Sequence, residues 1–338
     1  MHPELIPTVR AMVAADKGLL AMDESNPTCH KRFAALGIPQ TEEYRRAWRE
    51  LIVTTPGLGE AISGAILYDE TMRQKTKSGR PFIECLQKQG IVPGIKVDLG
   101  AKALALFPDE KVTEGLDGLR GRLKDYFQLG ARFAKWRGVI VINAGIPTAG
   151  CLEANAHALA RYAALCQEAG IVPIVEPEVL MDGAHTLQRC AEVTEEILVK
   201  LFGQLFEQRV DLRATILKPN MVLPGKDCPV QDGVETVAEA TVRMLLKAVP
   251  QAIPGVAFLS GGQSPELATA RLNAMHVNHK KLPWALTFSY SRATQQPALE
   301  LWAGKDENVE AAQKALYHRA KLNSDARRGE YKPEMEKA

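Results

Sequence analysis

Charged side chains follow short apolar runs at several places along the chain. Asp23 comes after a run that begins at Gly18, and Lys218 comes after another that begins at Ala214. The residues placed in this way are Asp23, Lys96, Asp98, Lys135, Arg137, Glu176, Glu178, Lys218 and Arg292. One lysine or aspartate at the end of a strand is usually a capping or snorkelling residue. Several buried at one mouth are costly unless they pair, so together they indicate a function.

Lysines in such a group indicate covalent chemistry on a carbonyl compound. A desolvated lysine near other cations has its ammonium form disfavoured, and the neutral amine can attack a carbonyl carbon. The iminium that results withdraws electrons, which suits the making or breaking of a neighbouring carbon–carbon bond, while carboxylates carry protons. On residue chemistry alone, Lys96, Lys135 and Lys218 are all candidates for the nucleophile.

A second kind of site is predicted near residues 260–262 and Arg292. Ser260, Gly261 and Gly262 follow an apolar run and lead into a helical pattern. Glycines let backbone N–H groups approach an anion, and the start of a helix favours negative charge. Arg292 follows the next apolar run and can hold a phosphate with two hydrogen bonds. A lone Ser-Gly-Gly is weak evidence, but beside Arg292 it predicts a phosphate site.

A metal site is not predicted. The seven histidines are His2, His30, His157, His185, His276, His279 and His318, and none ends an apolar run. A catalytic zinc of the usual kind needs several inward histidines. The count of histidines does not bear on a magnesium ion held by carboxylates, but the neighbouring lysines would repel such an ion.

The elements that must position these residues are eight short apolar runs. They span residues 18–23, 64–69, 92–98, 133–140, 171–178, 214–219, 256–262 and 285–292. Near-continuous apolar runs are typical of parallel strands that are buried on both faces. Helical patterns separate them, for example after Thr41, after Ser264 and over residues 184–208. The alternation predicts a closed (β/α)₈ TIM barrel rather than a dinucleotide-binding fold, since no G-x-G-x-x-G motif follows the first run.

Composition restricts the class of protein. We expect one barrel domain over residues 1–338, in which residues 306–338 form a last helix and a polar tail. A net charge of +2 without a basic run argues against a nucleic-acid partner, and no apolar stretch is long enough for a membrane. The six scattered cysteines are expected to be free thiols, and the N-terminus does not resemble a secretory signal. These features predict a cytoplasmic protein.

Seven segments together resemble class I fructose-bisphosphate aldolases, over nearly the whole chain. They are AMDES (21–25), GIKVD (94–98), FAKWR (133–137), VPIVEPE (172–178), LKPNM (217–221), FLSGGQS (258–264) and SYSRA (289–293). The segment from Asp23 to Cys29 looks most like the plastid and bacterial branch of this family. The resemblance implies a TIM-barrel lyase that commonly forms a homotetramer and needs no metal or other cofactor.

The resemblance also assigns roles to individual residues. It implies that Lys218 forms the Schiff base and that Glu176 is the principal proton acceptor and donor, with Glu178 nearby shaping its charge. Lys135 would hold the local electrostatics, and Asp23 would orient the substrate hydroxyl that drives bond cleavage. The implied reaction is reversible cleavage of fructose 1,6-bisphosphate to dihydroxyacetone phosphate and glyceraldehyde 3-phosphate, in glycolysis, gluconeogenesis or the Calvin cycle.

Two phosphate positions are implied as well. One uses Ser260, Gly261, Gly262 and Arg292, with the backbone N–H of Ser291 at a position where the family often has glycine. The other uses Ser25, Lys96, Lys31 and Arg32, with Thr28 at a position often filled by serine, and Arg137 also belongs to the substrate-binding set. The segment after Lys332 lacks the long tail that ends in tyrosine in better-known members, which affects the expected late proton transfer.

Two other interpretations keep the same barrel. Another Schiff-base aldolase, acting on a sugar with one phosphate or transferring a three-carbon unit, would retain the lysine but needs a single phosphate site. A scaffold protein without catalysis would have no need of Lys218 and Glu176, and both are present.

Overall fold

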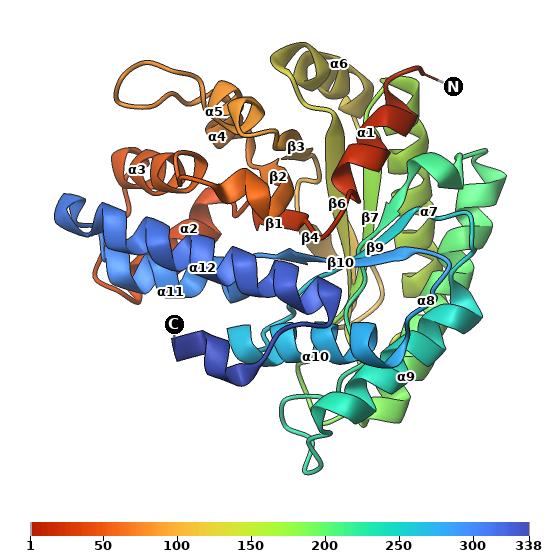
Figure 1. The fold of residues 1–338 in the computed structure, drawn as a ribbon. Helices are drawn as coiled ribbons and strands as arrows, with labels where there is room; N and C mark the ends of the chain where they lie inside the picture. Colours follow the sequence, from red (N-terminus) through yellow and green to blue (C-terminus); the bar gives the residue numbers. More distant parts are fainter. Residues whose placement is uncertain (1, 338) are drawn as a thin grey trace.

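The computed structural model describes residues 2–337 and contains a closed barrel of parallel strands. The strands are β1 (Gly18–Met22), β2 (Ile62–Leu67), β3 (Val92–Lys96), β6 (Phe133–Ile140), β7 (Val172–Val179), β8 (Ile216–Leu217), β9 (Gly255–Phe258) and β10 (Ala285–Tyr290). Their order around the barrel is β1-β10-β9-β8-β7-β6-β3-β2. Figure 1 shows the strands with the helices around them. Each lies within or overlaps one of the eight predicted runs, so the predicted TIM barrel is confirmed.

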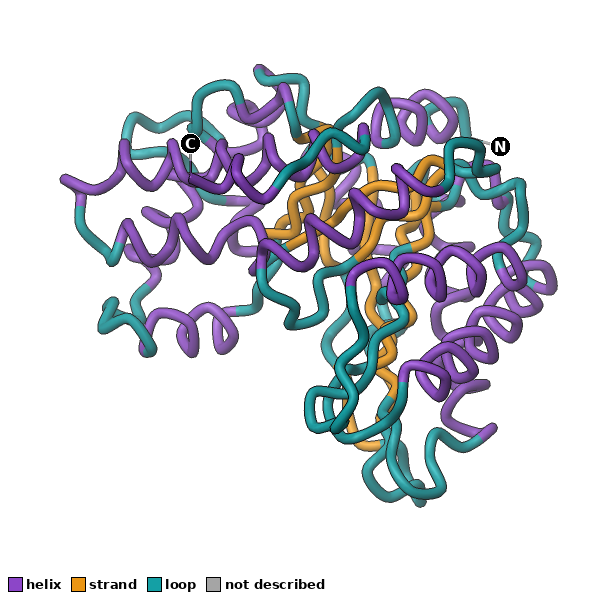
Figure 2. The backbone as a smooth tube through the Cα atoms, turned by 60° about the horizontal axis from the view of Figure 1, so that its bottom comes forward, coloured by secondary structure: helices purple, strands orange, loops and turns teal. Residues whose placement is uncertain are grey.

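Helices surround the strands on the outside of the barrel (Figure 2). They are α1 (Leu5–Met12), α2 (Asn26–Ala34), α3 (Glu42–Val53), α4 (Asp69–Arg73), α5 (Phe82–Lys88), α6 (Leu119–Leu129), α7 (Ala149–Glu168), α8 (Leu187–Glu207), α9 (Val234–Ala248), α10 (Pro265–Asn278), α11 (Arg292–Trp302) and α12 (Val309–Arg328). The hydroxyl of Thr41 accepts from Tyr44 N at 3.4 Å and that of Ser264 accepts from Leu267 N at 3.2 Å. Both predicted helix starts therefore have a side-chain N-cap.

The end of the barrel interior beneath α1 is apolar. Leu5, Val9 and Met12 of α1 pack against the first residues of several strands, including Phe133 and Ile216. Gly94 of β3 leaves room for the ring of Phe133, which a side chain at position 94 would meet at 2.2 Å. The N-terminal ends of the strands are thus sealed by packing, and the charged residues are left to the opposite end.

The chain after residue 305 differs in detail from the predicted helix and tail. A short turn at Asp306–Asn308 precedes α12, and a second turn follows at Pro333–Lys337. Leu316, Ala320 and Ala326 of α12 are buried in the main core, so this helix belongs to the outer layer of the barrel. Residues 1 and 338 of the predicted domain lie outside the described residues.

A hairpin of β4 (Ala101–Ala103) and β5 (Lys111–Thr113) was not predicted from the sequence. Three-residue strands are too short to show a hydrophobic period. The hydroxyl of Thr113 donates to the backbone oxygen of Arg137 at 2.6 Å, which ties the hairpin to β6 beside the barrel mouth.

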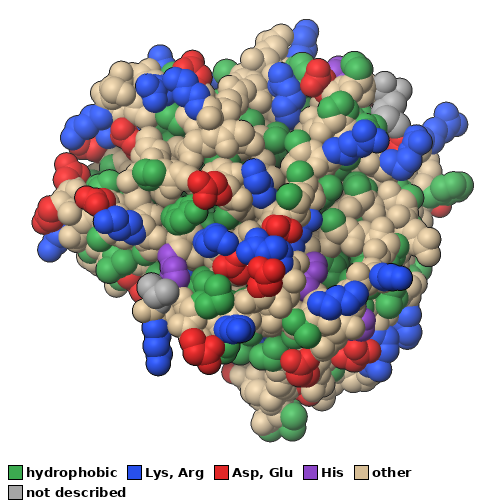
Figure 3. All heavy atoms as spheres, in the orientation of Figure 1, with side chains coloured by type: hydrophobic (Ala, Val, Ile, Leu, Met, Phe, Trp, Pro, Cys, Tyr) green, Lys and Arg blue, Asp and Glu red, His purple; other side chains and the backbone are tan. Residues whose placement is uncertain are grey.

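Other expectations from composition can be compared with the structure. All six cysteines are free, as predicted, and the structure shows that all six are buried. Within residues 2–337, no helix has the length and apolar character needed to cross a membrane. Figure 3 shows basic and acidic side chains interspersed over the face that it draws.

Candidate active site

The C-terminal ends of the strands surround a cavity of about 850 Å³. The predicted site residues that line it are Asp23, Ser25, Thr28, Lys31, Arg32, Lys96, Lys135, Arg137, Glu176, Glu178, Lys218, Ser260, Gly261, Ser291 and Arg292. Gly262 is the predicted residue that does not line it, although a side chain there would lie 3.4 Å from an Nη of Arg292. The structure therefore brings together residues that are almost 270 positions apart in sequence.

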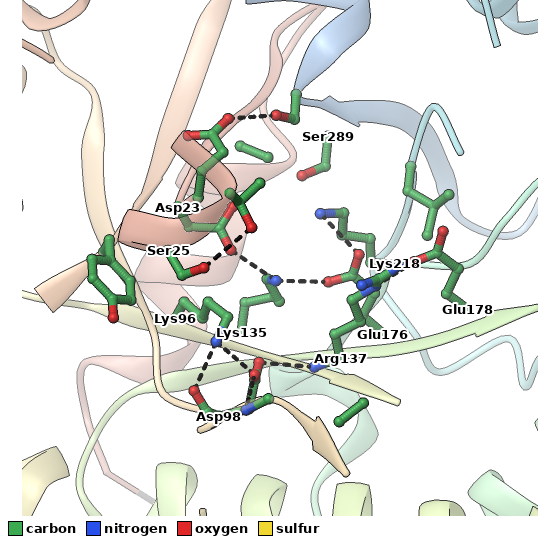
Figure 4. Close-up of a pocket in the computed structure, with 18 of the residues that line it drawn as sticks. Asp23, Ser25, Lys96, Asp98, Lys135, Arg137, Glu176, Glu178, Lys218 and Ser289 are labelled. Carbon is green, nitrogen blue, oxygen red and sulfur yellow. Dashed lines mark hydrogen bonds and ion pairs between the residues drawn. The ribbon is translucent and has the colours of Figure 1, made fainter. Parts of the chain in front are cut away.

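Four buried charged residues form a continuous chain across the mouth (Figure 4). Nζ of Lys135 lies 2.8 Å from Oδ2 of Asp23 and 3.2 Å from Oε2 of Glu176. Nζ of Lys218 lies 3.3 Å from the other oxygen of Glu176. Asp23 follows β1, Lys135 and Glu176 lie on β6 and β7, and Lys218 follows β8. Acid and base alternate along the chain, so each buried charge has an opposite charge beside it.

The protonation states in this chain follow from the pairing. Burial disfavours the Lys135 ammonium, but the carboxylates of Asp23 and Glu176 outweigh it and raise the pKa of Lys135. Burial favours the neutral acids, but Lys135 and Lys218 lower the pKa values of Asp23 and Glu176 below the usual range. At neutral pH Lys135 is therefore a fixed cation, and both carboxylates are ionised.

The three lysines of the mouth differ in their partners. Lys135 lies between two carboxylates, and Nζ of Lys96 is held by Oδ1 of Asp98 at 2.6 Å and by the backbone oxygen of Asp98 at 2.8 Å. Within the described chain, the ion-pair partner of Lys218 is Glu176 alone. Lys218 is therefore the lysine of this group least restrained by other side chains, and its Nζ faces a base.

Glu176 has an oxygen that is suited to proton transfer. Its Oε2 is buried and has no hydrogen-bond partner among residues 2–337, because the contact with Lys135 lacks the geometry of a hydrogen bond. Glu178, two residues along the same strand, instead forms an ion pair with Nε of Arg137. Burial opposes the Arg137 cation, but Glu178 outweighs it and raises the Arg137 pKa. Glu178 is thus held by Arg137, while one oxygen of Glu176 is left free of hydrogen bonds from the described residues.

One side of the mouth has the features of an anion site. Gly261 and Gly262 have φ values of +51° and +81°, which other residues rarely adopt, and they turn the chain from β9 toward α10. Arg292, the first residue of α11, lies beside Gly262. Burial, and then the neighbouring Arg32, lower the pKa of Arg292. A phosphate bound here would relieve that repulsion between cations.

The second predicted anion position is more open. The hydroxyls of Ser25 and Thr28 lie 3.1 Å apart on the first turn of α2, and Lys31 is exposed one turn later. Arg32, which was grouped with Lys31, donates to Glu24 at 2.5 Å and to the hydroxyl of Ser291 at 3.2 Å. It therefore lies close to Arg292, and its assignment to the second phosphate stays a prediction.

Ser289 and Glu24 are residues of the mouth that received no role from the sequence. Ser289 lines the cavity with a buried hydroxyl that has no partner among the described residues (Figure 4). Glu24 accepts hydrogen bonds from Arg32, Arg49, Ser291 and Gln295. Ser289 could have been noticed because it is a polar residue within an apolar run. Nothing in the sequence distinguished Glu24, whose side chain is buried, from an exposed glutamate.

The donor set of the mouth is unsuited to a metal ion. Within residues 2–337, no group of three or more His, Cys, Asp or Glu side chains is arranged to hold one. Each carboxylate of the charged chain is next to a lysine, which would repel a cation. These carboxylates are therefore better suited to pairing with amines than to holding a metal.

Comparison with known proteins gives one consistent family. The family described as "Glycolytic: Fructose-bisphosphate aldolase class-I" matches residues 4–338. A protein of Xanthomonas axonopodis pv. citri named "Probable fructose-bisphosphate aldolase class 1" is 59% identical over 97% of this chain and 98% of its own length. "Fructose-bisphosphate aldolase 4, cytosolic" of Arabidopsis thaliana is 50% identical over 97% of this chain and 84% of its length.

A solved structure agrees with the sequence comparisons. It is the fructose-bisphosphate aldolase of Plasmodium falciparum, in a ternary complex with TRAP and a small-molecule inhibitor. The likeness has a TM-score of 0.96 and 48% sequence identity, and it covers 97% of this chain and 95% of that one.

Proposed function

The chain belongs to the class I fructose-bisphosphate aldolase family, and we propose that its barrel mouth performs this reaction through a Schiff base on Lys218. Class I aldolases are lyases that cleave fructose 1,6-bisphosphate reversibly to dihydroxyacetone phosphate and glyceraldehyde 3-phosphate. They use a lysine Schiff base and no metal ion. The observation that carries the proposal for Lys218 is the buried chain Asp23–Lys135–Glu176–Lys218.

The charged chain supports a sequence of proton transfers. Nζ of Lys218 attacks the ketone carbon of the substrate. Glu176, 3.3 Å away, accepts the protons that this nitrogen loses and passes them to the former ketone oxygen, which leaves as water. The iminium then accepts the electron pair of the breaking carbon–carbon bond, while Asp23 orients the neighbouring hydroxyl and Glu176 accepts the proton that this hydroxyl loses. Lys135 keeps both carboxylates ionised before the reaction. Each step therefore has a side chain among these four charged residues that can carry it out.

Two anion positions support a bisphosphate as substrate. Gly261, Gly262 and Arg292 follow β9 and β10, whereas Ser25, Thr28 and Lys31 follow β1 and Lys96 ends β3. An aldolase for a sugar with one phosphate would need only one such position. Cleavage of mono- and bisphosphorylated ketoses, measured side by side, tests the difference, and a preference for monophosphates would contradict the proposal.

We further infer that the protein is a homotetramer in the cytoplasm. Exposed apolar side chains support association of copies, since Phe206 at the end of α8 is 84% exposed and Val199 of the same helix is 57% exposed. A relative with a cytosolic name supports the location. Sedimentation of the purified protein at micromolar concentration tests the assembly, and a monomer would contradict it.

Trapping the iminium tests the role of Lys218. Borohydride added with dihydroxyacetone phosphate should inactivate the enzyme irreversibly, and mass spectrometry should locate the added mass on Lys218. Borohydride without the ketone is the control and should leave activity intact. Full activity after the combined treatment, or loss of activity in EDTA, would overturn the mechanism.

A further inference from the structure

Strand β8, which directly precedes Lys218, loses its pairing with β7 just where the active site begins. β8 has two residues, and its register with β7 consists of Ile174–Ile216 and Val175–Leu217. Lys218 N then donates to the oxygen of Val175 at 2.9 Å. The next residue is Pro219, which has no N–H with which to continue the ladder. Beyond Lys218, backbone pairing with β7 therefore cannot hold the segment in register.

The side chain of Asn220 bridges this gap. Its Oδ1 accepts from Val179 N of β7 at 3.0 Å. Its Nδ2 donates to Thr194 Oγ1 of α8 at 3.2 Å and to the oxygen of Met221 at 3.0 Å. The amide is buried, with 3% of the residue exposed. One side chain thus connects the segment after Lys218 with the end of β7 and with α8.

We propose that Asn220 is a positioning residue that holds Lys218 at reacting distance from Glu176, an inference that rests on the proposed role of Lys218. Val179 directly follows Glu178 and lies three residues after Glu176. The hydrogen bond from Val179 N to Asn220 therefore connects β7, which carries Glu176, with the segment that follows Lys218. Pro219 lies between Lys218 and Asn220, and its rigid ring passes a shift of one to the other. The distance at stake is the 3.3 Å between Nζ of Lys218 and Oε1 of Glu176.

The chemistry of the position requires an asparagine. A primary amide on a short side chain offers one acceptor and two donors, and all three directions are used here. Aspartate would keep the acceptor for Val179 but lose the donors, and leucine, of similar size, would lose both. A misplacement of about 1 Å at reacting atoms can cost on the order of 100-fold in rate.

Asn220 acts on the rate and not on binding, because it does not reach the substrate. Among residues 2–337, those that line the mouth do not include it, and it instead borders a separate cavity of about 10 Å³ with Cys190 and Met221. The anion-binding residues lie on other elements. We therefore expect a change in kcat with little change in KM.

Asn220→Leu tests the inference, with Thr241→Val as the matched control. Thr241 is buried, and its hydroxyl accepts from Val222 N at 2.9 Å, so its loss removes one bond to the same segment, two residues further on. Both variants are compared by kcat, KM, melting temperature and the single-turnover rate of iminium formation, read by borohydride trapping. Asn220→Leu should lower kcat and the trapping rate about 10- to 100-fold, with KM within about threefold. Thr241→Val should keep kcat within about twofold, whatever stability it loses.

The outcomes separate this inference from the proposed function. Wild-type kcat in Asn220→Leu, or an equal fall in Thr241→Val, would overturn the positioning role. Failure of the wild-type enzyme to be labelled at Lys218 would overturn the proposed function instead. If Asn220→Leu does not fold, Asn220→Asp carries the test, since it keeps the acceptor: a reduced kcat at unchanged KM supports the role, and a wild-type kcat overturns it.

Discussion

Two seams of the barrel hold their strands in different ways. Between β6 and β7 the register runs over eight pairs, from Phe133–Val172 to Ile140–Val179. Between β10 and β1 the register pairs of the described chain are Leu19–Ser289 and Leu20–Tyr290. The first pair of strands continues as a backbone ladder past Lys135 and Glu176, whereas the second has two register pairs.

The difference shows where side chains replace the ladder. Lys135 and Glu176 are placed by paired backbone on β6 and β7. At the β10–β1 seam, Glu24 instead accepts from Ser291 at 2.7 Å and from Gln295 at 2.9 Å, and Gln295 also donates to the oxygen of Ala21 at 2.6 Å. A buried polar network thus closes the barrel where hydrogen bonds between strands have ended.

Lys218→Met should reduce catalysis more than any other substitution at the mouth. Lys218 follows a short ladder, but Glu176 keeps Lys135 as a partner in the variant, so the fold should persist. Without the nucleophile, we expect kcat to fall by several orders of magnitude. Activity assays with circular dichroism measure both effects, and loss of the native spectrum would show that the lysine is structural.

Lys135→Met should damage both rate and stability. The substitution leaves Asp23 without its ion-pair partner and removes one of two cations from Glu176. Breaking a buried pair in this way costs about 3–5 kcal/mol. Urea unfolding measures the loss, and because the β6–β7 ladder is intact we expect a folded protein. A free energy of unfolding equal to that of the wild type would show that the carboxylates are stable without Lys135.

Glu24→Gln tests the polar network between β10 and β1 through the pH dependence of the free energy of unfolding. Burial favours the neutral acid, but Arg49 and Arg32 outweigh it and hold the pKa of Glu24 far below its usual value of 4.5. A carboxyl group whose pKa is lowered by folding stabilises the folded state at pH values above its pKa in the unfolded chain. This contribution is lost as the pH falls below that value. The free energy of unfolding of the variant should therefore be lower than that of the wild type by about 3 kcal/mol at pH 7. This difference should become smaller below about pH 4.5. A gap that is constant from pH 7 to pH 4 would contradict this.

Arg292→Ala should have a smaller effect that is confined to binding. Its guanidinium lies beside Gly262 at the anion position and is not part of the charged chain. Loss of a hydrogen-bonded cation should raise KM for fructose 1,6-bisphosphate about 10- to 100-fold, with kcat changed much less. Steady-state kinetics decide the matter, and an unchanged KM would remove Arg292 from the phosphate site.

Much of the barrel follows from local pattern, while details of its mouth do not. Apolar runs such as residues 171–178 predicted their strands because a strand buried on both faces must be apolar almost throughout. The β4–β5 hairpin was missed because its strands are too short to have a period. Glu24 was given no role because its four donors come from α2, α3, the β10–α11 junction and α11. The sequence does not show that these segments meet.

The three lysines of the mouth also show what the sequence determines and what it leaves to the tertiary structure. Their type and their place after apolar runs are properties of the sequence, and these determined a barrel with amine, carboxylate and anion-binding groups at one end. Only the tertiary structure decided that Lys96 is tied to Asp98, that Lys135 lies between Asp23 and Glu176, and that Lys218 faces Glu176. The reason is physical: an ion pair depends on distances of a few ångströms between strands that are far apart in the chain, and these distances are set by register and packing.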